Sequence, residues 1–340
     1  MSDSRSSYIS IFKATSLFGG VQLYQIFIQI VKSKVIAVLL GPFGVGIMGL
    51  FQSGLSLVQQ ITGMGLSSSA VRDVSEAYGT GDMNRISQTV TSLRRLVWIT
   101  GLLGLIIVVF TSPFFSKSSF GNYDYTFQFI ILSVTLLFDQ LAVGQKVLLQ
   151  GMRRLKDLAL CSAVGVTAGL AISVPLYYWL GVSGIAPTLV LTSVCSLCVT
   201  WLFARKVKIK KAVITIKETF ARGRHMLVMG VSMSFSGILA SGVAYVTRGY
   251  IQGVGGVEEV GLYQAGHVII TTYVGLVMNS IATDYYPRLA SINKDNEKCR
   301  EAVCQQGEIG TMILAPLLTM CLVFMPFVLR IPVESLQYAA

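Results

Sequence analysis

The chain has 340 residues, of which 53% are hydrophobic and 13% are charged, and its mean hydropathy is +0.66. Soluble globular domains carry roughly 25% charged residues, so this composition excludes an ordinary soluble domain and indicates a membrane protein. A net charge of +11 would also suit a nucleic-acid-binding protein. Here, however, the basic residues lie between long uncharged stretches, where they would face anionic lipid headgroups, so no nucleic-acid partner is expected.

Nine segments are predicted to cross the membrane as helices. A helix needs about 20 apolar residues to span a bilayer core, where no water can pair an exposed backbone amide. Stretches such as 96–116 and 158–203 contain no Asp, Glu, Lys or Arg. The predicted spans are residues 14–39, 44–68, 96–115, 126–149, 158–180, 184–203, 226–250, 260–283 and 309–329.

The distribution of basic residues predicts the orientation of these spans. With the N-terminus placed in the cytoplasm, 21 of the 27 Lys and Arg residues fall in cytoplasmic segments. This asymmetry follows the positive-inside rule, so we expect a multi-pass protein with a cytoplasmic N-terminus. The basic residues inside spans or on the other side are Lys32, Lys34, Lys117, Lys146, Arg248 and Arg330.

A six-residue motif occurs twice, as GLFQSG at 49–54 and as GLYQAG at 261–266, 212 positions apart. In nearly the same register SPFFSK corresponds to MPFVLR, and Gly41 corresponds to Gly253. Several matches in one register predict an internal duplication. Six predicted spans separate the copies, so both copies run in the same direction and form two parallel-repeat helical bundles.

The predicted fold is therefore an all-α polytopic membrane protein. An N-terminal six-helix bundle is expected at 1–203, a basic cytoplasmic linker helix on the membrane surface at 204–225, and a partial C-terminal bundle at 226–340. The second copy contains three of the six spans of the first. A truncated product or a fragment is expected, and an inactive remnant is one alternative.

The sequence LGPFGVG at 40–46, between the first two spans, resembles the same connection in Wzx-type O-antigen translocases. These are flippases of lipid-linked oligosaccharides in the MATE-like MOP superfamily, and YYPRLA at 285–290 is also similar to that family. The resemblance implies twelve helices in two bundles around a central cleft. It implies that an undecaprenyl-pyrophosphate-linked repeat unit of a surface polysaccharide moves from the inner to the outer leaflet of the bacterial inner membrane. Besides membrane lipids, a polysaccharide polymerase and a chain-length regulator become candidate partners.

Three basic residues inside spans are candidate ligands of the pyrophosphate. A charge at the bilayer centre costs several kcal/mol, so a flippase needs a wet cleft that contains cations. Lys32 and Lys34 lie in the first span, and Arg248 lies near the end of the matching seventh span. We expect a cation of each bundle to bind phosphate oxygens. The alternative is that these side chains extend to the outer interface.

Other polar residues inside the spans are candidates for a sugar-binding cavity or for ion coupling. They are Gln25, Gln29, Gln52, Asp139, Lys146 and His267. Asp139 and Lys146 lie about two turns apart on one helix face, either as a coupling site or as an internal polar pair. His267 is either a proton relay or a packed polar residue.

The LGPFGVG connection contains glycines and a proline, which permit either bending or close helix packing. These candidate hinge residues for alternating access are Gly41, Pro42, Gly44 and Gly46.

No phosphate-binding GxxxxGK[ST], nucleophile elbow or HExxH motif occurs, so the protein is not expected to be an enzyme or to need a cofactor. Cys195 and Cys198 form a CxxC inside an uncharged span without a second pair, so no metal site is expected. The main alternative to a flippase is a MATE-type ion-coupled exporter of small cationic compounds. Such an exporter would need acidic residues in its cleft, whereas the charges inside these spans are mostly basic.

Overall fold

The computed structural model describes residues 2–207, 209, 212, 214–291, 296–308, 310–312, 315, 316, 319 and 323. The chain divides into two compact units, Met1–Gly261 and Leu262–Ala340, each of which is treated by itself. Every regular element among the described residues is a helix, which confirms the predicted all-α membrane fold. The predicted division into bundles at 1–203 and 226–340 stays a prediction.

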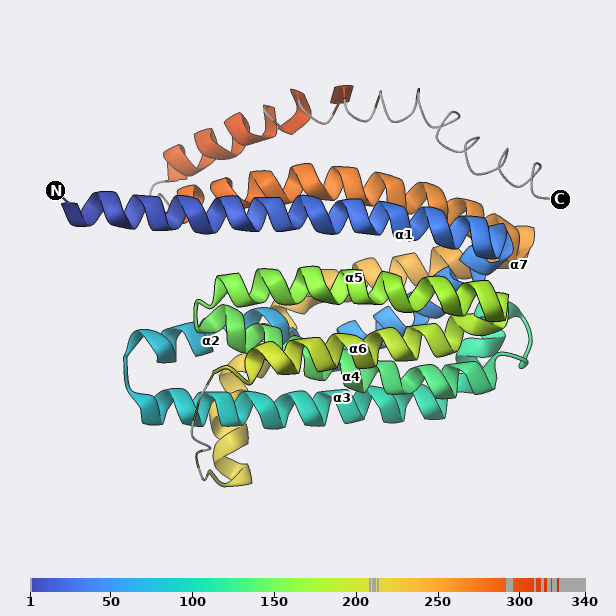
Figure 1. Cartoon of the computed structure of the whole chain (residues 1–340), viewed down its shortest axis with the longest axis horizontal. Coiled ribbons are helices and arrows are strands. Elements are labelled where there is room, and N and C mark those ends of the chain that lie inside the picture. The colour runs from blue at the N-terminus through green and yellow to red at the C-terminus, as the bar shows by residue number, and fades with distance from the viewer. Residues whose placement is uncertain are drawn as a thin grey trace. The chain divides into compact units, whose positions relative to one another are not determined.

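Long helices joined by short connections make up the first unit (Figure 1). In chain order the elements are α1 (Ser2–Gly63), α2 (Leu66–Gly79), α3 (Met83–Phe120), α4 (Thr126–Gly151), α5 (Leu155–Leu180), the 3-10 helix η1 (Gly181–Gly184), α6 (Ile185–Ala204) and α7 (Ile216–Ser291). The residues of α7 from 262 onward belong to the second unit, in which residues 296–308 are also helical.

Four helical stretches of the described chain are long and apolar enough to cross a membrane, and a bent pair, Met226–Ser232 with Ser234–Val268, makes a fifth. The four are Gly20–Gly79, Met83–Phe120, Thr126–Gly151 and Leu155–Ala204. The first and last contain 60 and 50 residues, far more than the roughly 20 of one crossing. They are interrupted at Gly41 and at η1, so each contains a predicted pair of spans. The ninth predicted span, 309–329, lies largely outside the described residues.

The predicted connection between the first two spans is a one-residue break in α1 rather than a loop. Gly41 has φ 64° and ψ −176°, a backbone conformation that is essentially restricted to glycine. Pro42 begins the next helical segment, a position where a missing N–H leaves no hydrogen bond unmade. The long helix α7 contains a break of the same geometry at Gly256, with φ 82° and ψ −177°.

The helical segments that follow these two breaks cross each other closely. A Cβ atom on Gly46 would collide with the carbonyl oxygen of Val257, and a Cβ atom on Gly261 would collide with the carbonyl oxygen of Pro42. The contact is therefore reciprocal, as expected for two similar segments related by an approximate twofold axis. Only glycine allows the two backbones to approach this closely.

The crossing also corrects the register of the predicted duplication. Gly41 and Gly256 are 215 positions apart, as are the two glycines at the crossing, whereas the repeated hexamers are 212 positions apart. The predicted pairing of Gly41 with Gly253 is therefore wrong by three residues. The break requires a glycine with positive φ, and in α7 this residue is Gly256. Gly253 lies three residues earlier, nearly one helical turn away, in regular helix, so its match to Gly41 in the sequence did not identify the break.

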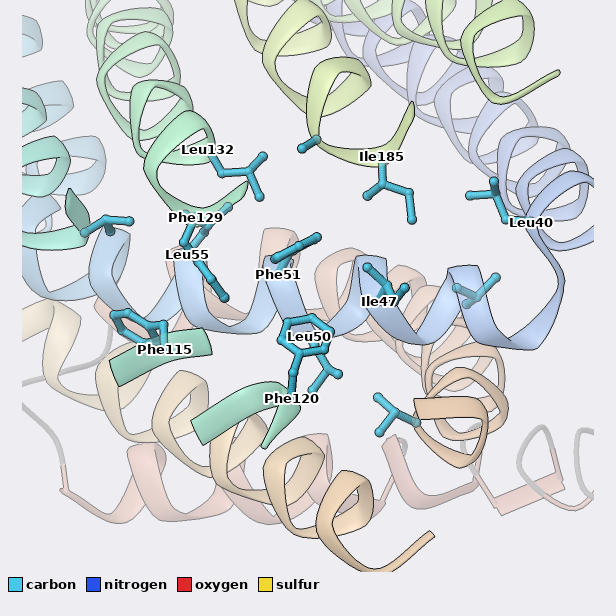
Figure 2. Close-up of a cluster of buried hydrophobic side chains, with 14 of the residues drawn as sticks. Leu40, Ile47, Leu50, Phe51, Leu55, Phe115, Phe120, Phe129, Leu132 and Ile185 are labelled. Carbon is cyan, nitrogen blue, oxygen red and sulfur yellow. The ribbon is translucent and has the colours of Figure 1, made fainter. Parts of the chain in front are cut away.

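Aromatic side chains hold the second half of α1 against α3 and α4 (Figure 2). The ring centroid of Phe51 lies 5.3 Å from that of Phe120 and 5.0 Å from that of Phe129. Phe120 stacks on Tyr125 with a centroid distance of 3.9 Å. Such aromatic pairs add directional packing to the burial of apolar area, so this cluster positions the α1 segment that carries Gln52.

The segment between α6 and α7 differs from the predicted surface helix at 204–225. Its described residues become helical only from Ile216 onward. Arg95 of α3 donates from Nη1 to the carbonyl oxygen of Ile214 at 2.8 Å and to Thr219 Oγ1 at 2.9 Å. These charge-assisted hydrogen bonds fasten the non-helical segment to α3, which amphipathicity alone does not predict.

Candidate functional site

A cavity of about 310 Å³ lies between the second half of α1, α4 and α6. This volume is at the lower end of the range found for small-ligand pockets. Three leucines line it together with seven residues that have polar side chains. The polar residues are Gln52, Ser56 and Gln59 of α1, Thr135 and Asp139 of α4, and Thr192 and Ser193 of α6. We call this site the polar cavity.

Helical periodicity brings the polar side chains to one face of each helix. On α1, Gln52, Ser56 and Gln59 are spaced by four and three residues, and on α4 Thr135 precedes Asp139 by four. The structure thus brings together Gln52 and Asp139, which are among the residues predicted from the sequence. Ser56 and Thr135 are not among them, although their helical spacing from the predicted residues was a signal that could have found them.

The hydroxyl groups around the polar cavity donate to their own helices. Ser56 Oγ donates to the carbonyl oxygen of Ser53 at 3.0 Å, and Thr135 Oγ1 donates to that of Leu132 at 2.6 Å. Ser193 Oγ does the same within α6. The oxygen atoms of these hydroxyls can still accept hydrogen bonds, while the glutamine amides can both donate and accept.

Asp139 supplies the negative charge of the cavity wall. Within the described part of the chain its carboxylate forms no direct ion pair and accepts no hydrogen bond. Lys146 lies two turns farther along α4, on the same helix face as Asp139. Whether the two residues form a coupling site or an internal polar pair stays a prediction, and the carboxylate of Asp139 is available to a ligand.

This lining suits a ligand that carries several hydroxyl groups. A hydroxyl can donate to the oxygens of Asp139, Ser56 and Thr135 and can accept from the glutamine amides. A diphosphate carries negative charge and only accepts hydrogen bonds, so the carboxylate of Asp139 would repel it. The polar cavity therefore fits a sugar or a cation better than a phosphate group.

The three predicted phosphate ligands lie outside the polar cavity. Lys32 and Lys34 lie on the first half of α1, where Lys32 Nζ is 4.0 Å from the Cβ position of Gly169 in α5 and Lys34 is exposed beside a groove. Arg248 of α7 is only 6% exposed and donates from Nη1 to the carbonyl oxygen of Ala244 at 3.0 Å. The cations and the polar cavity are thus separate features of the first unit.

The part of α7 around Arg248 packs against the end of α3. Tyr245, one turn earlier, accepts a hydrogen bond from Ser119 Oγ at 3.3 Å, and its ring centroid is 5.6 Å from that of Phe115. Lys32, by contrast, lies beside α5. A clamp formed by the arginine and the lysines stays a prediction.

The remaining polar candidates are distributed over both units. Gln25 is half-buried and Gln29 is exposed on the first half of α1, outside the polar cavity. His267 belongs to the second unit, where its ring stacks on Tyr263 with a centroid distance of 5.5 Å. This contact fits a packed histidine, and a role in proton transfer stays a prediction.

The four candidate hinge residues have two different roles: two form the break in α1, and two lie in the packed helix that follows it. Gly41 forms the break and Pro42 follows it, whereas Gly44 and Gly46 lie in buried positions of the next helical segment. Gly46 makes the crossing with α7. Movement at the break stays a prediction, while close packing accounts for Gly46.

Solved structures that share this fold are MATE transporters. An inward-facing multidrug resistance MATE family transporter of the MOP superfamily matches with a TM-score of 0.73 and 18% identity, over 91% of this chain and 71% of that one. The MATE multidrug transporter DinF-BH, solved as a complex, matches with a TM-score of 0.63 and 12% identity, over 93% and 74%. A MATE protein in the bent conformation matches with a TM-score of 0.61 and 15% identity, over 95% and 76%. The fold defines a MATE-like multi-pass membrane protein.

Within that class, a family model described as polysaccharide biosynthesis protein matches residues 35–333. The match covers most of the chain, which therefore belongs to the polysaccharide biosynthesis protein family. This match confirms the resemblance predicted from the sequence at the level of the polysaccharide biosynthesis family, and the fold agrees with a MATE-like architecture. No curated protein sequence matches the chain.

Proposed function

We propose that this protein flips lipid-linked oligosaccharide repeat units, of O-antigen or a related surface polysaccharide, from the inner to the outer leaflet by alternating access. The observation that carries the proposal is the polar cavity inside a MATE-like fold of the polysaccharide biosynthesis family. Its amide, hydroxyl and carboxylate groups match the hydroxyls of a sugar. The diphosphate of the lipid carrier is bound by the basic residues outside the cavity.

The proposed location is the bacterial inner membrane, with the N-terminus in the cytoplasm. The excess of Lys and Arg on one side of the spans supports this orientation. A repeat unit delivered to the outer leaflet needs proteins that use it there, so a polysaccharide polymerase and a chain-length regulator are the proposed partners. In the absence of a nucleotide-binding motif, an ion gradient or the substrate gradient drives the cycle.

The proposal is tested by measuring surface glycan in cells that lack the gene and carry variants at equal protein level. Gln52→Ala and Asp139→Asn are each expected to lower the rate of glycan display about tenfold, because a lost hydrogen bond to the ligand costs about 1.4 kcal/mol. Gln150→Ala is the matched control, since this glutamine is exposed at the end of α4. Wild-type display by both cavity variants would contradict the proposed role of the polar cavity.

A second candidate function is the export of small cationic compounds. Asp139 favours it, because an unpaired carboxylate in a cavity attracts a cation, and two of the matched structures are described as multidrug transporters. Cells that express the protein would then remove a cationic dye, and Asp139→Asn would abolish this efflux. Dye efflux without any effect on surface glycan would favour the exporter over the flippase.

A further inference from the structure

The four hydroxyl groups of the polar cavity all donate to backbone carbonyl oxygens of their own helices. Within α6, Thr192 Oγ1 and Ser193 Oγ donate over 3.0 and 2.9 Å. Ser56 and Thr135 donate in the same way within α1 and α4, over 3.0 and 2.6 Å. A hydroxyl whose hydrogen is engaged in this way can still accept a hydrogen bond but cannot donate one to a ligand. These side chains therefore present acceptors to whatever enters the cavity.

Asp139 adds further acceptor oxygens and the only charge of the cavity wall. The lining residues, all of which belong to the described part of the chain, include no Lys, Arg or His. Free donors are limited to the side-chain amides of Gln52 and Gln59. The wall of the cavity is thus rich in acceptors, poor in donors and negatively charged.

Basic residues do not neutralise this charge within the cavity. Lys146 lies two turns farther along α4, but it does not line the cavity, and no ion pair of the described chain joins it to Asp139. The candidate diphosphate ligands Lys32, Lys34 and Arg248 also lie outside. Acceptors for a ligand with hydroxyl groups and cations for an anionic group are therefore kept in different parts of the first unit.

This lining discriminates between a neutral sugar and an acidic one. Each hydroxyl of a sugar has a hydrogen that it can donate to an acceptor of the wall. A carboxylate has no hydrogen to donate, so only the two glutamine amides can bind it, and the carboxylate of Asp139 repels it. Exchanging the hydroxymethyl group of a hexose for a carboxylate therefore turns a matched ligand into a mismatched one.

We propose that the polar cavity holds one sugar unit that has free hydroxyl groups and no carboxylate, and that Asp139 excludes acidic sugars. The volume of about 310 Å³ suits one such unit rather than a whole oligosaccharide. The inference rests on the proposed flippase function and adds to it the chemical class of the sugar at this site and the residue that determines it.

Binding of matched sugars to the purified protein tests the inference. The full chain in nanodiscs of the zwitterionic lipid phosphatidylcholine is titrated with glucose, galactose and mannose and with the uronic acid of each, and saturation-transfer NMR measures binding. We expect at least one of the hexoses to bind, and its uronic acid to bind at least about tenfold more weakly. Binding of none of the hexoses, or equal binding of a hexose and its uronic acid, would overturn the inference.

Two substitutions with opposite effects on charge test whether the cavity wall causes the selection. Asp139→Asn removes the charge and nearly keeps the side-chain shape, so the affinities for the hexose and its uronic acid should come within about twofold of each other. Gln59→Glu adds a second carboxylate, so the ratio of the two affinities should rise by at least about tenfold. An unchanged ratio in both variants would overturn the inference.

Matched changes outside the cavity serve as controls. Asp124→Asn removes a carboxylate from the exposed connection between α3 and α4, and Gln60→Glu adds one at the exposed position next to Gln59. Both controls should keep the wild-type ratio. A control that changes the ratio as much as its cavity counterpart would show that the net charge of the protein selects the sugar, which also overturns the inference.

Two readouts taken together separate this inference from the proposed function. Surface glycan display that does not depend on the protein, together with the expected selective binding, would remove the flippase function alone. Display that depends on the protein, together with equal binding of hexoses and uronic acids, would remove the inference alone. A cationic dye that binds in place of the hexoses, and no longer binds to Asp139→Asn, would overturn the inference in favour of an exporter.

Discussion

Gly46 of α1 and Gly261 of α7 contact each other reciprocally: a Cβ atom on either glycine would lie 3.1 Å from the amide nitrogen of the other. Each residue lies five positions after a left-handed glycine, Gly41 or Gly256. Two segments far apart in the sequence thus repeat one local structure and use it to pack against each other. The crossing joins the two copies of the predicted duplication within the first unit.

Positions 46 and 261, where the two helices cross, are expected to require glycine. Gly46→Ala and Gly261→Ala each force a methyl group onto a backbone carbonyl oxygen, so each should lower the free energy of unfolding by about 1–3 kcal/mol. Thermal unfolding of the purified protein in detergent measures this. Gly242→Ala, whose Cβ would make an ordinary 4.0 Å contact with Leu57, is the control and should be nearly neutral. Neutral behaviour of both crossing variants would show that the helices do not cross here.

The two helix breaks are expected to require glycine for a different reason. A Cβ atom on Gly41 or Gly256 would meet no atom within 4 Å, so the cost of Gly41→Ala and Gly256→Ala comes from the backbone conformation alone. That cost is about 1–3 kcal/mol for a residue held in a region open essentially to glycine. The same unfolding measurement applies. Gly253→Ala, in open space within regular helix, should instead stabilise by up to about 1 kcal/mol. If Gly256→Ala also stabilised the protein, Gly256 would not have the non-helical conformation of a helix break.

The basic residues inside the spans are expected to be needed for translocation. Lys32→Ala and Lys34→Ala each remove a cation that binds the diphosphate, and Arg248→Lys keeps the charge but loses the two-pronged guanidinium geometry. Each should lower surface glycan display about tenfold at equal protein level. Lys117→Ala is the control, because this exposed lysine lies at the end of α3. Normal display by all three variants would exclude the cation clamp.

The connection between α6 and α7 is expected to open when Arg95 is removed. Arg95→Ala loses the hydrogen bonds to Ile214 and Thr219, so limited trypsin digestion at Lys206 should become about tenfold faster. Arg94→Ala removes an exposed arginine from the neighbouring position and serves as the control. Identical digestion of the two variants would mean that these bonds do not hold the segment.

Membrane class, helical content and the end of the first span at Gly41 follow from the sequence because they depend on local properties. A run such as 158–203 without a charged residue has few stable environments besides a bilayer. Gly41-Pro42 likewise marks a helix boundary through the backbone freedom of glycine and the missing amide of proline. The family resemblance rests on the same short motif and is confirmed by the match to residues 35–333.

The polar cavity depends on contacts that no single segment contains. Gln52 and Asp139 are separate candidates in the sequence, and only the packing of α1 against α4 and α6 places them in one cavity. The same packing leaves Lys32 and Arg248 outside this cavity. The sequence of each helix, through its helical periodicity, determines which polar and apolar side chains lie on each of its faces. Which faces meet depends on the rotation and crossing of the helices, and here the contacts of Phe51 with Phe120 and Phe129 hold α1 against α3 and α4.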